Sequence, residues 1–156
     1  MKEQEILKSN IEICDIHADR IQQALNYLKP LLPIQPSALE SLGGQDLGFL
    51  ELLTGRFAKL QDAIGQKIFP NLLEILKEDI EGQSFLDILN RLEKLGILEN
   101  VEFWLELRKI RNSIAHEYPD NPELMAKNLN QAFSASFKLL DYWLLLKGYI
   151  ARKISE

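Results

Sequence analysis

Apolar residues recur at helical spacing over long stretches of this chain, and this feature limits its fold more than any other. In residues 3–29 an apolar residue returns every three or four positions, with charged side chains between. That is the period of one buried face of an α-helix. No stretch shows the two-residue alternation of a half-buried strand, and no internal repeat or low-complexity segment is present. The sequence therefore predicts an all-α protein.

Prolines, glycines and capping residues divide the chain into separate helices. Residues 30–44 hold three prolines and two glycines, so they are expected to form the longest loop. Pro70 either kinks the second helix or begins a new one, because proline is tolerated in a first helical turn. The apolar pattern then continues to Gly82. The expected helices span residues 3–29, 46–82 in one piece or two, 84–95, 100–117 and 122–148, the last with Asn121 as its cap.

Five or six helices of unequal length predict an antiparallel bundle with four main helices plus one or two short ones. A chain of 156 residues suits a single domain that can bury a real core. Within the last helix, residues 143–146 are apolar on all sides. We expect this run to be either deeply buried or pressed against a second chain.

The composition narrows the class of protein. A net charge of −5 disfavours a general nucleic-acid coat protein, although an acidic enzyme can still meet RNA in a small basic patch. The single cysteine excludes an internal disulfide, and no cysteine–histidine cluster has zinc-ligand spacing. The polar N-terminus lacks a signal core, and no run reaches the roughly 18 apolar residues of a membrane span. We expect a cytoplasmic protein with no membrane segment, metal or cofactor.

One short segment, residues 108–120, concentrates groups that can do chemistry. Trp104, Arg108 and Arg111 follow one another at helical spacing, which predicts a stripe beside the main apolar face. An arginine half sheltered there must keep its guanidinium hydrogen-bonded. Because Pro119 disfavours helical geometry just before it, His116 and the tyrosine that follows are expected on the last turn.

Taken singly, these residues have ordinary explanations. A lone helical arginine is usually solvated, and a lone histidine near a helix C-terminus often only complements the helix dipole. The combination Arg111-x4-His116-x-Tyr118 is more specific. The histidine titrates near neutral pH and can move a proton, and the arginine can pair with a phosphate. RNA needs little more, since its own 2′-OH is the nucleophile once deprotonated.

This spacing resembles the motif of the HEPN superfamily and, within it, of the HepT toxins of HepT/MntA toxin–antitoxin modules. Asn112 fits too, because these proteins commonly carry a polar residue after the arginine. The resemblance implies a single HEPN-like helical domain over residues 1–156 and a homodimer with paired motifs at its interface. It also implies a metal-independent endoribonuclease acting on cellular RNA, such as tRNA or mRNA. Arg111 would bind the scissile phosphate, His116 would be the general acid/base, and Asn112 would orient one of them.

The same resemblance implies a partner, an MntA-like nucleotidyltransferase antitoxin. In this family it transfers AMP from ATP to the motif tyrosine, and Tyr118 matches that position. AMP there would place a phosphate and a purine beside the arginine and histidine. The added phosphate would compete with RNA for the same cation.

Further cations are candidates for RNA binding. Arg108 and Lys109 would enlarge the patch around the motif, and two chains together would double it. Residues 55–62 resemble the second-helix pattern of HepT-like proteins, so Arg56 or Lys59 would guide a phosphate, although a solvated charged face is the simpler explanation. His17, on or beside the apolar stripe of the first helix, is expected to be a packing histidine.

Two alternatives stay open. The chain would also suit a non-catalytic helical module that binds a nucleotidyltransferase and helps to present its substrate, with the motif as an interaction surface. The acidic composition favours this alternative, and the intact motif disfavours it. A structural dimer without chemistry is the third hypothesis.

Overall fold

The computed structural model describes residues 2–114 and 120–154, and all regular structure within these ranges is helical. The prediction of an all-α protein is therefore confirmed. The elements are α1 (Lys2–Leu28), the 3-10 turns η1 (Lys29–Leu31) and η2 (Pro36–Ser41), α2 (Gly44–Ala63), the π-helical turn η3 (Ile64–Ile68), α3 (Phe69–Ile75), α4 (Phe85–Lys94), α5 (Val101–Ile114) and α6 (Pro122–Ile154).

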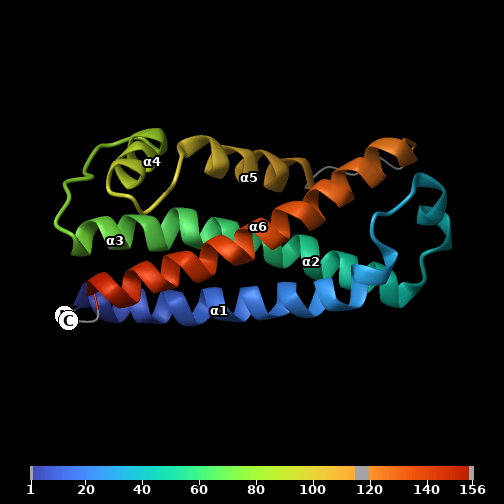
Figure 1. Cartoon of the computed structure of the whole chain (residues 1–156), viewed down its shortest axis with the longest axis horizontal. Helices are drawn as coiled ribbons and strands as arrows, with labels where there is room; N and C mark the ends of the chain where they lie inside the picture. Colours follow the sequence, from blue (N-terminus) through green and yellow to red (C-terminus); the bar gives the residue numbers. More distant parts are fainter. Residues whose placement is uncertain (1, 115–119, 155–156) are drawn as a thin grey trace.

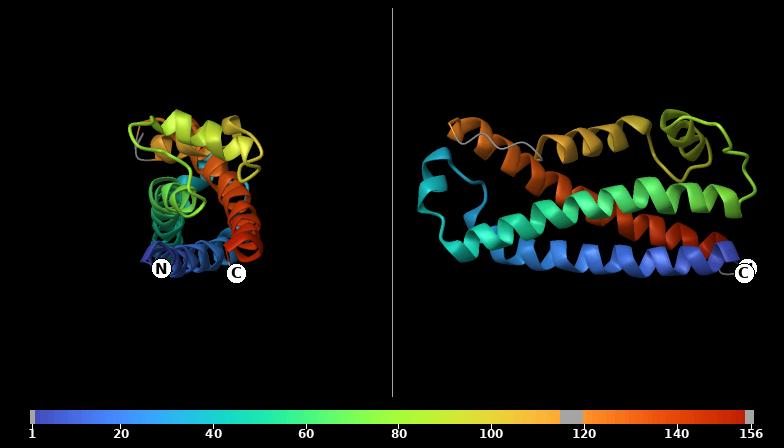
Figure 2. Two further views of the ribbon diagram at one scale, coloured as in Figure 1. Left: turned by 90° about the vertical axis from the view of Figure 1, so that its left-hand side faces the viewer. Right: turned by 180° about the vertical axis from the view of Figure 1, so that it is seen from behind.

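Four long helical segments run side by side with alternating direction (Figure 1). They are α1, the continuous α2–η3–α3 segment, α5 and α6. In the end-on view of Figure 2, α1 lies below, α4 and α5 lie above, and α6 faces the α2–α3 segment from the opposite side. The short α4 crosses the end of the bundle instead of running along it. The part of the chain that the structure describes thus has the four main helices and one short helix that the sequence predicted.

The seam between α1 and α2 is the apolar centre of the bundle. Leu7, Cys14, Ile21 and Leu28 recur every seven residues on α1, and all four are buried. A seven-residue repeat keeps one stripe facing a neighbouring helix along its whole length. Burial raises the pKa of the Cys14 thiol to about 12, so the thiol stays protonated. Cys14 thus fills the core as a small apolar side chain. On α2, Leu53, Phe57 and Leu60 are each fully buried in the same core.

The helix that contains Pro70 continues past it through a local change of winding. Proline has no N–H, and its ring crowds the carbonyl four residues earlier, so an unmodified α-helix would be broken there. The π-helical turn η3 lies just before Pro70, and the Phe69 N–H reaches back five residues to the Ile64 carbonyl. The sequence predicted either a kink or a fresh helix at Pro70. The structure instead has a continuous helical segment with one wider, π-helical turn before the proline.

This helix ends earlier than predicted. It stops at Ile75 instead of continuing to Gly82, so the predicted end is wrong. Lys77 adopts a positive φ of 61°, and the Glu78 N–H donates to the Leu73 carbonyl at 2.8 Å. This is a Schellman cap, which satisfies the last carbonyls of the helix and turns the chain away. The apolar spacing in the sequence continues beyond Ile75, but the backbone leaves the helix there.

Predicted helix starts agree with the structure. Ser84 and Asp87 form a reciprocal capping box at α4, and the Asn121 side chain accepts the Leu124 N–H at α6. The predicted end of the last helix near Gly148 is wrong, because α6 continues to Ile154. The physical reason is burial beyond the glycine, since Ile150 packs into the core.

The apolar run of α6 divides between two environments. Trp143 and Leu146 are buried, whereas Leu144 and Leu145 are 64% and 70% exposed. Sequence periodicity left burial and contact with a second chain open for the whole run. Within one chain, half of the run is core and half faces outward.

Candidate functional site

The predicted stripe on α5 faces one polar pocket. Trp104, Arg108 and Arg111 line it, as expected for residues spaced by four and three positions. Asn112 lies beside them and lines the same pocket. Its volume is about 270 Å³, and its described lining comes from α2, η3, α4 and α5. The other lining residues are Gln61, Asp62, Gly65, Gln66 and Phe85.

Arg111 is held by a two-point ion pair across the α2–α5 seam. Its Nε donates to Oδ1 of Asp62 at 3.2 Å, and its Nη2 donates to Oδ2 at 2.9 Å. The hydrogen bond to this carboxylate raises the pKa of Arg111, with a further contribution from the opposite charge. The fork geometry fixes the plane of the guanidinium. Its Nη1 donates to no described residue, so this edge remains available for a ligand.

Arg108 is held differently. Its guanidinium carbon lies 4.6 Å above the centre of the Phe85 ring, a cation–π contact between α5 and the start of α4. It makes no ion pair within residues 2–114 and 120–154. Among the described residues that line the pocket, Arg108 and Arg111 are positive and Asp62 is negative, which leaves one net positive charge. This local surplus contrasts with the net charge of −5 of the whole chain.

One buried polar group at the pocket has no hydrogen-bond partner among the described residues. The Nε1–H of Trp104 is buried without an acceptor. Gln61, which is only 3% exposed, lines the same pocket with its carboxamide. Nearly all buried polar groups in folded proteins are paired, so an orphaned indole N–H beside a pocket is unusual. The adjacent π-helical turn adds to this, because such turns occur frequently at functional sites.

The remaining predicted residues lie elsewhere. Lys109 is exposed on α5 and does not line the pocket. His116 and Tyr118, the predicted acid/base and modification site, lie outside the described residues. The structure thus brings Arg108, Arg111 and Asn112 together, and the roles predicted for these three and for Lys109, His116 and Tyr118 remain predictions.

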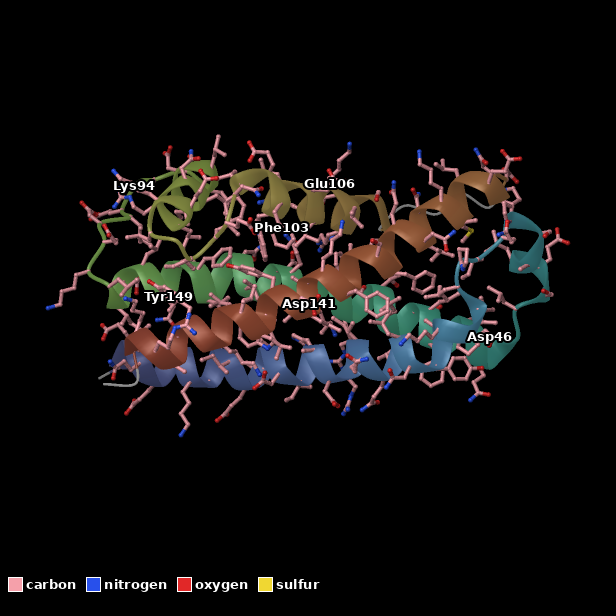
Figure 3. All side chains as sticks on the ribbon, viewed as in Figure 1. Asp46, Lys94, Phe103, Glu106, Asp141 and Tyr149 are labelled. Atoms are coloured by element: carbon pink, nitrogen blue, oxygen red, sulfur yellow. The ribbon has the colours of Figure 1, made fainter. Side chains whose placement is uncertain are left out.

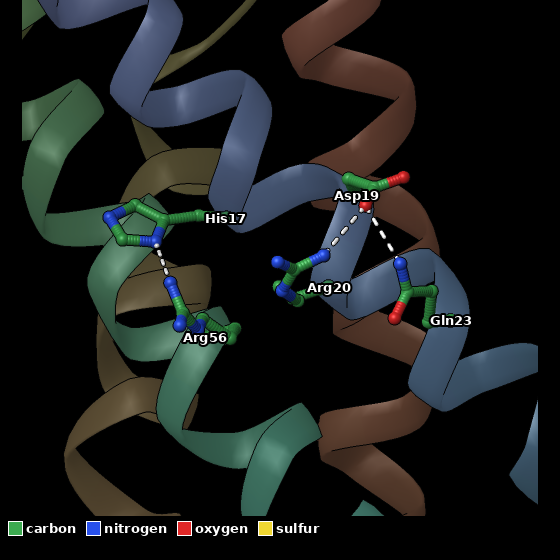
Figure 4. A network of polar contacts seen from close by, with 5 residues as sticks. All are labelled: His17, Asp19, Arg20, Gln23 and Arg56. Atoms are coloured by element: carbon green, nitrogen blue, oxygen red, sulfur yellow. Dashed lines mark hydrogen bonds and ion pairs between the residues drawn. The ribbon is translucent and has the colours of Figure 1, made fainter.

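Arg56 and Lys59 lie on α2, and neither lines the pocket. Arg56 Nη1 is 3.0 Å from Nδ1 of His17 on α1, so this histidine bridges two helices (Figure 4). Burial first, then the charges of Arg56 and Lys59, lower the pKa of His17. Lys59 is exposed and lies three residues from both Arg56 and Asp62, which places the three on neighbouring turns of α2. Their predicted part in RNA binding stays a prediction.

Several pocket residues were missed in the sequence. Asp62 looked like part of a charged outer face, and Gln61, Gly65 and Gln66 carry no motif. The one usable signal was the demand of a sheltered arginine for an acceptor. That demand predicts a carboxylate or carbonyl nearby but does not say on which helix.

A second depression lies between α6 and the start of α5. It has a volume of about 500 Å³, and Phe103, Asp141 and Tyr149 are among its lining residues (Figure 3). None of the predicted site residues lines it. Across the described ranges, no helix has the length and apolar character needed to cross a bilayer. The same ranges hold no group of three or more histidine, cysteine or acidic side chains arranged for a metal ion.

Comparisons with protein-family models, with curated proteins and with solved structures found no match to this chain. The resemblance to the HEPN motif therefore depends on the residues of the motif itself.

Proposed function

We propose that this chain is a homodimeric, metal-independent endoribonuclease of the HEPN type, the toxin of a HepT/MntA-like toxin–antitoxin module. The observation that carries the proposal is the shared pocket of Arg108, Arg111 and Asn112, which lies on α5 a few residues before His116 in sequence. One net positive charge among the described lining suits a phosphodiester, which carries one negative charge.

In the proposed reaction, a histidine takes the proton of the ribose 2′-OH, and the 2′ oxygen attacks the adjacent phosphorus. The bond from phosphorus to the 5′ oxygen breaks and leaves a cyclic phosphate. The 5′ oxygen takes up a proton and becomes a hydroxyl. His116 would move these protons, and the free edge of Arg111 would stabilise charge on the phosphoryl oxygens. Asn112 would orient one of these groups.

A dimer would complete this chemistry, because one imidazole cannot both remove and deliver a proton at the same moment. Two copies of the motif facing across a two-fold axis would supply two imidazoles and two arginines. Arg108 and Arg111 are accessible for such an arrangement, whereas Trp104 is fully buried within its own chain. We expect light scattering of the purified chain to give twice the 18.0 kDa chain mass. A monomer at micromolar concentration would remove the composite site.

The decisive experiment is incubation of purified protein with total RNA in EDTA, followed by sequencing of the ends. The wild type should cleave, and Arg111→Ala and His116→Ala should each abolish cleavage. Arg152→Ala on α6 is the matched control for loss of one arginine outside the pocket, and it should cleave normally. Cleavage by His116→Ala protein that persists in EDTA would refute the assigned role.

The proposed regulation is AMP transfer to Tyr118 by a nucleotidyltransferase antitoxin. Co-expression with the partner should raise the intact mass by one or more AMP units, mapped by peptide analysis to Tyr118. Tyr118→Phe should remain toxic or become harder to neutralise. Full neutralisation of Tyr118→Phe, without a mass change on the wild type, would mean inhibition by binding alone.

One observation favours a second candidate, the non-catalytic module that binds a nucleotidyltransferase. Asp62 occupies two donor positions of Arg111 and offsets its charge, as a purely structural ion pair would. Expression of the chain alone separates the two candidates. Growth arrest that requires Arg111 supports the nuclease, and unaffected growth with stable partner binding supports the module.

A further inference from the structure

The pocket at the α2–α5 seam contains groups that phosphate chemistry does not need. The Nε1–H of Trp104 is buried and lacks a described hydrogen-bond partner, and the carboxamide of Gln61 lines the same pocket. The exposed Gln66 and Asn112 add two further carboxamides to the lining. A phosphate only accepts hydrogen bonds, so it cannot pair with the carbonyl oxygens of these amides. A ligand that both donates and accepts matches this lining better.

A glycine lets the Trp104 indole pack closely against the helix backbone at the pocket. A Cβ added to Gly65 would lie 3.3 Å from Cζ2 and 3.4 Å from Nε1 of Trp104, and 3.7 Å from Cζ of Phe85. The indole edge, the Phe85 ring and the π-helical turn therefore converge on one spot. Glycine is disfavoured within a helix relative to alanine, so its presence here suits a close approach that a side chain would block.

Arg108 and Phe85 form a flat, partly cationic surface at the same pocket. Arg108 stacks over Phe85 at 4.6 Å, which gives a guanidinium plane and an aromatic ring at the pocket. Unstacked RNA bases bind on such planes and present mixed donors and acceptors along their edges. A volume of about 270 Å³ lies at the lower end of small-molecule sites, so the pocket suits a single nucleotide unit and not a duplex.

We propose that this pocket binds one nucleobase of single-stranded RNA, next to the phosphate held by the free edge of Arg111. Gln61 and the Trp104 Nε1–H contact the base edge, and Arg108 covers its face. The inference rests on the proposed function for the identity of the ligand, and it adds a determinant of which RNA sites are cut.

Binding of nucleoside monophosphates to the purified chain tests the pocket without any cleavage. Titration calorimetry would compare AMP, GMP, CMP and UMP with ribose 5-phosphate, which has the sugar and phosphate but no base. We expect the best nucleotide to bind at least about tenfold more tightly than ribose 5-phosphate. Equal affinities would overturn the inference, because they would mean that only the phosphate is recognised and that water satisfies the buried indole N–H.

Matched glycine variants locate the binding. Gly65→Ala adds one methyl group against the Trp104 indole and should weaken the best nucleotide by about tenfold or more. Gly48→Ala adds the same group to α2 where nothing lies within 4 Å, and it should leave affinity unchanged. Gln61→Leu keeps the size of the side chain and removes its polar atoms, so it provides a second variant if Gly65→Ala fails to fold. Unchanged nucleotide affinity in Gln61→Leu would overturn the inference.

Mapping of RNA ends separates this inference from the proposed function. The wild type should show a base preference at one position beside the cut, and Gln61→Leu should lose that preference. Base-selective nucleotide binding without RNA cleavage would refute the nuclease and keep the pocket. Cleavage without base preference or nucleotide discrimination would refute the pocket and keep the nuclease.

Discussion

The two seams that α2 forms with its neighbours differ in kind. On the α1 side, the first helix carries a buried apolar seven-residue repeat, and the polar contact between His17 and Arg56 is only partly buried. On the α5 side lie the Arg111–Asp62 pair and a pocket with the buried, unpaired indole N–H of Trp104. Apolar burial is the main source of stability, whereas unpaired buried polar groups cost free energy. We infer that the α1 seam stabilises the bundle and that the α5 seam carries the site at a cost in stability.

The largest expected effect is in the apolar core that α1 and α2 share. Phe57→Ala removes a fully buried ring from α2 and should lower the free energy of unfolding by about 3–5 kcal/mol. Urea denaturation followed by circular dichroism measures the change. The exposed Leu144→Ala on α6 is the control and should change the free energy of unfolding by less than about 0.5 kcal/mol. A loss below about 1 kcal/mol in Phe57→Ala would remove the contrast between the seams.

On the α5 seam, a loss of polarity should cost the fold little. Gln61→Leu replaces a carboxamide that lines the pocket with an apolar group of similar size. We expect the free energy of unfolding to change by less than about 1 kcal/mol, because side-chain size is kept and only the contacts of one amide are lost. The same urea titration measures it. A loss above about 2 kcal/mol would mean that the amide supports the core.

The Arg111–Asp62 pair should matter little for stability and more for function. Both side chains are about one-third exposed, at 31% and 37%, so solvent screens the pair. Asp62→Asn should cost less than about 1 kcal/mol of unfolding free energy. If the proposed nuclease is right, the same change should slow cleavage roughly 10- to 100-fold, because the guanidinium loses its fixed plane. A double-mutant cycle with Arg111→Gln measures the coupling, and equal cleavage by Asp62→Asn would refute the positioning role.

The smallest effect concerns pH and the edge of the α1 seam. Burial and the neighbouring cations lower the pKa of folded His17 below its ordinary value of 6.5. At this histidine, the unfolded chain therefore binds a proton more readily than the folded chain does. The contribution of His17 to the free energy of unfolding is fully present above about pH 6.5, and it is lost as the pH falls from there through the folded pKa. His17→Gln should flatten this slope between pH 7 and pH 5. Thermal unfolding in that range measures it, and an unchanged slope would assign the effect to other groups.

Local signals in the sequence determined much of the fold. The helical period and the absence of strand alternation fixed the all-α class, and Ser84 and Asn121 marked two helix starts. These features depend on residues a few positions apart, so a single sequence contains them. Two helix ends were misplaced for a tertiary or backbone reason. A cap at Lys77 stopped α3 early, and burial of Ile150 carried α6 past Gly148.

The candidate site was also predictable only in part from local signals. Periodicity on α5 was sufficient to place Trp104, Arg108 and Arg111 on one face, and the resemblance supplied a chemistry for them. Which acceptor meets Arg111, and which glycine lies against the Trp104 indole, depends on how the α2–η3 segment packs beside α5. Asp62 and Arg111 are 49 residues apart, and no local rule links residues at that separation. The sequence by itself therefore determined the helices and the chemical groups they carry, while helix packing decided which of those groups meet.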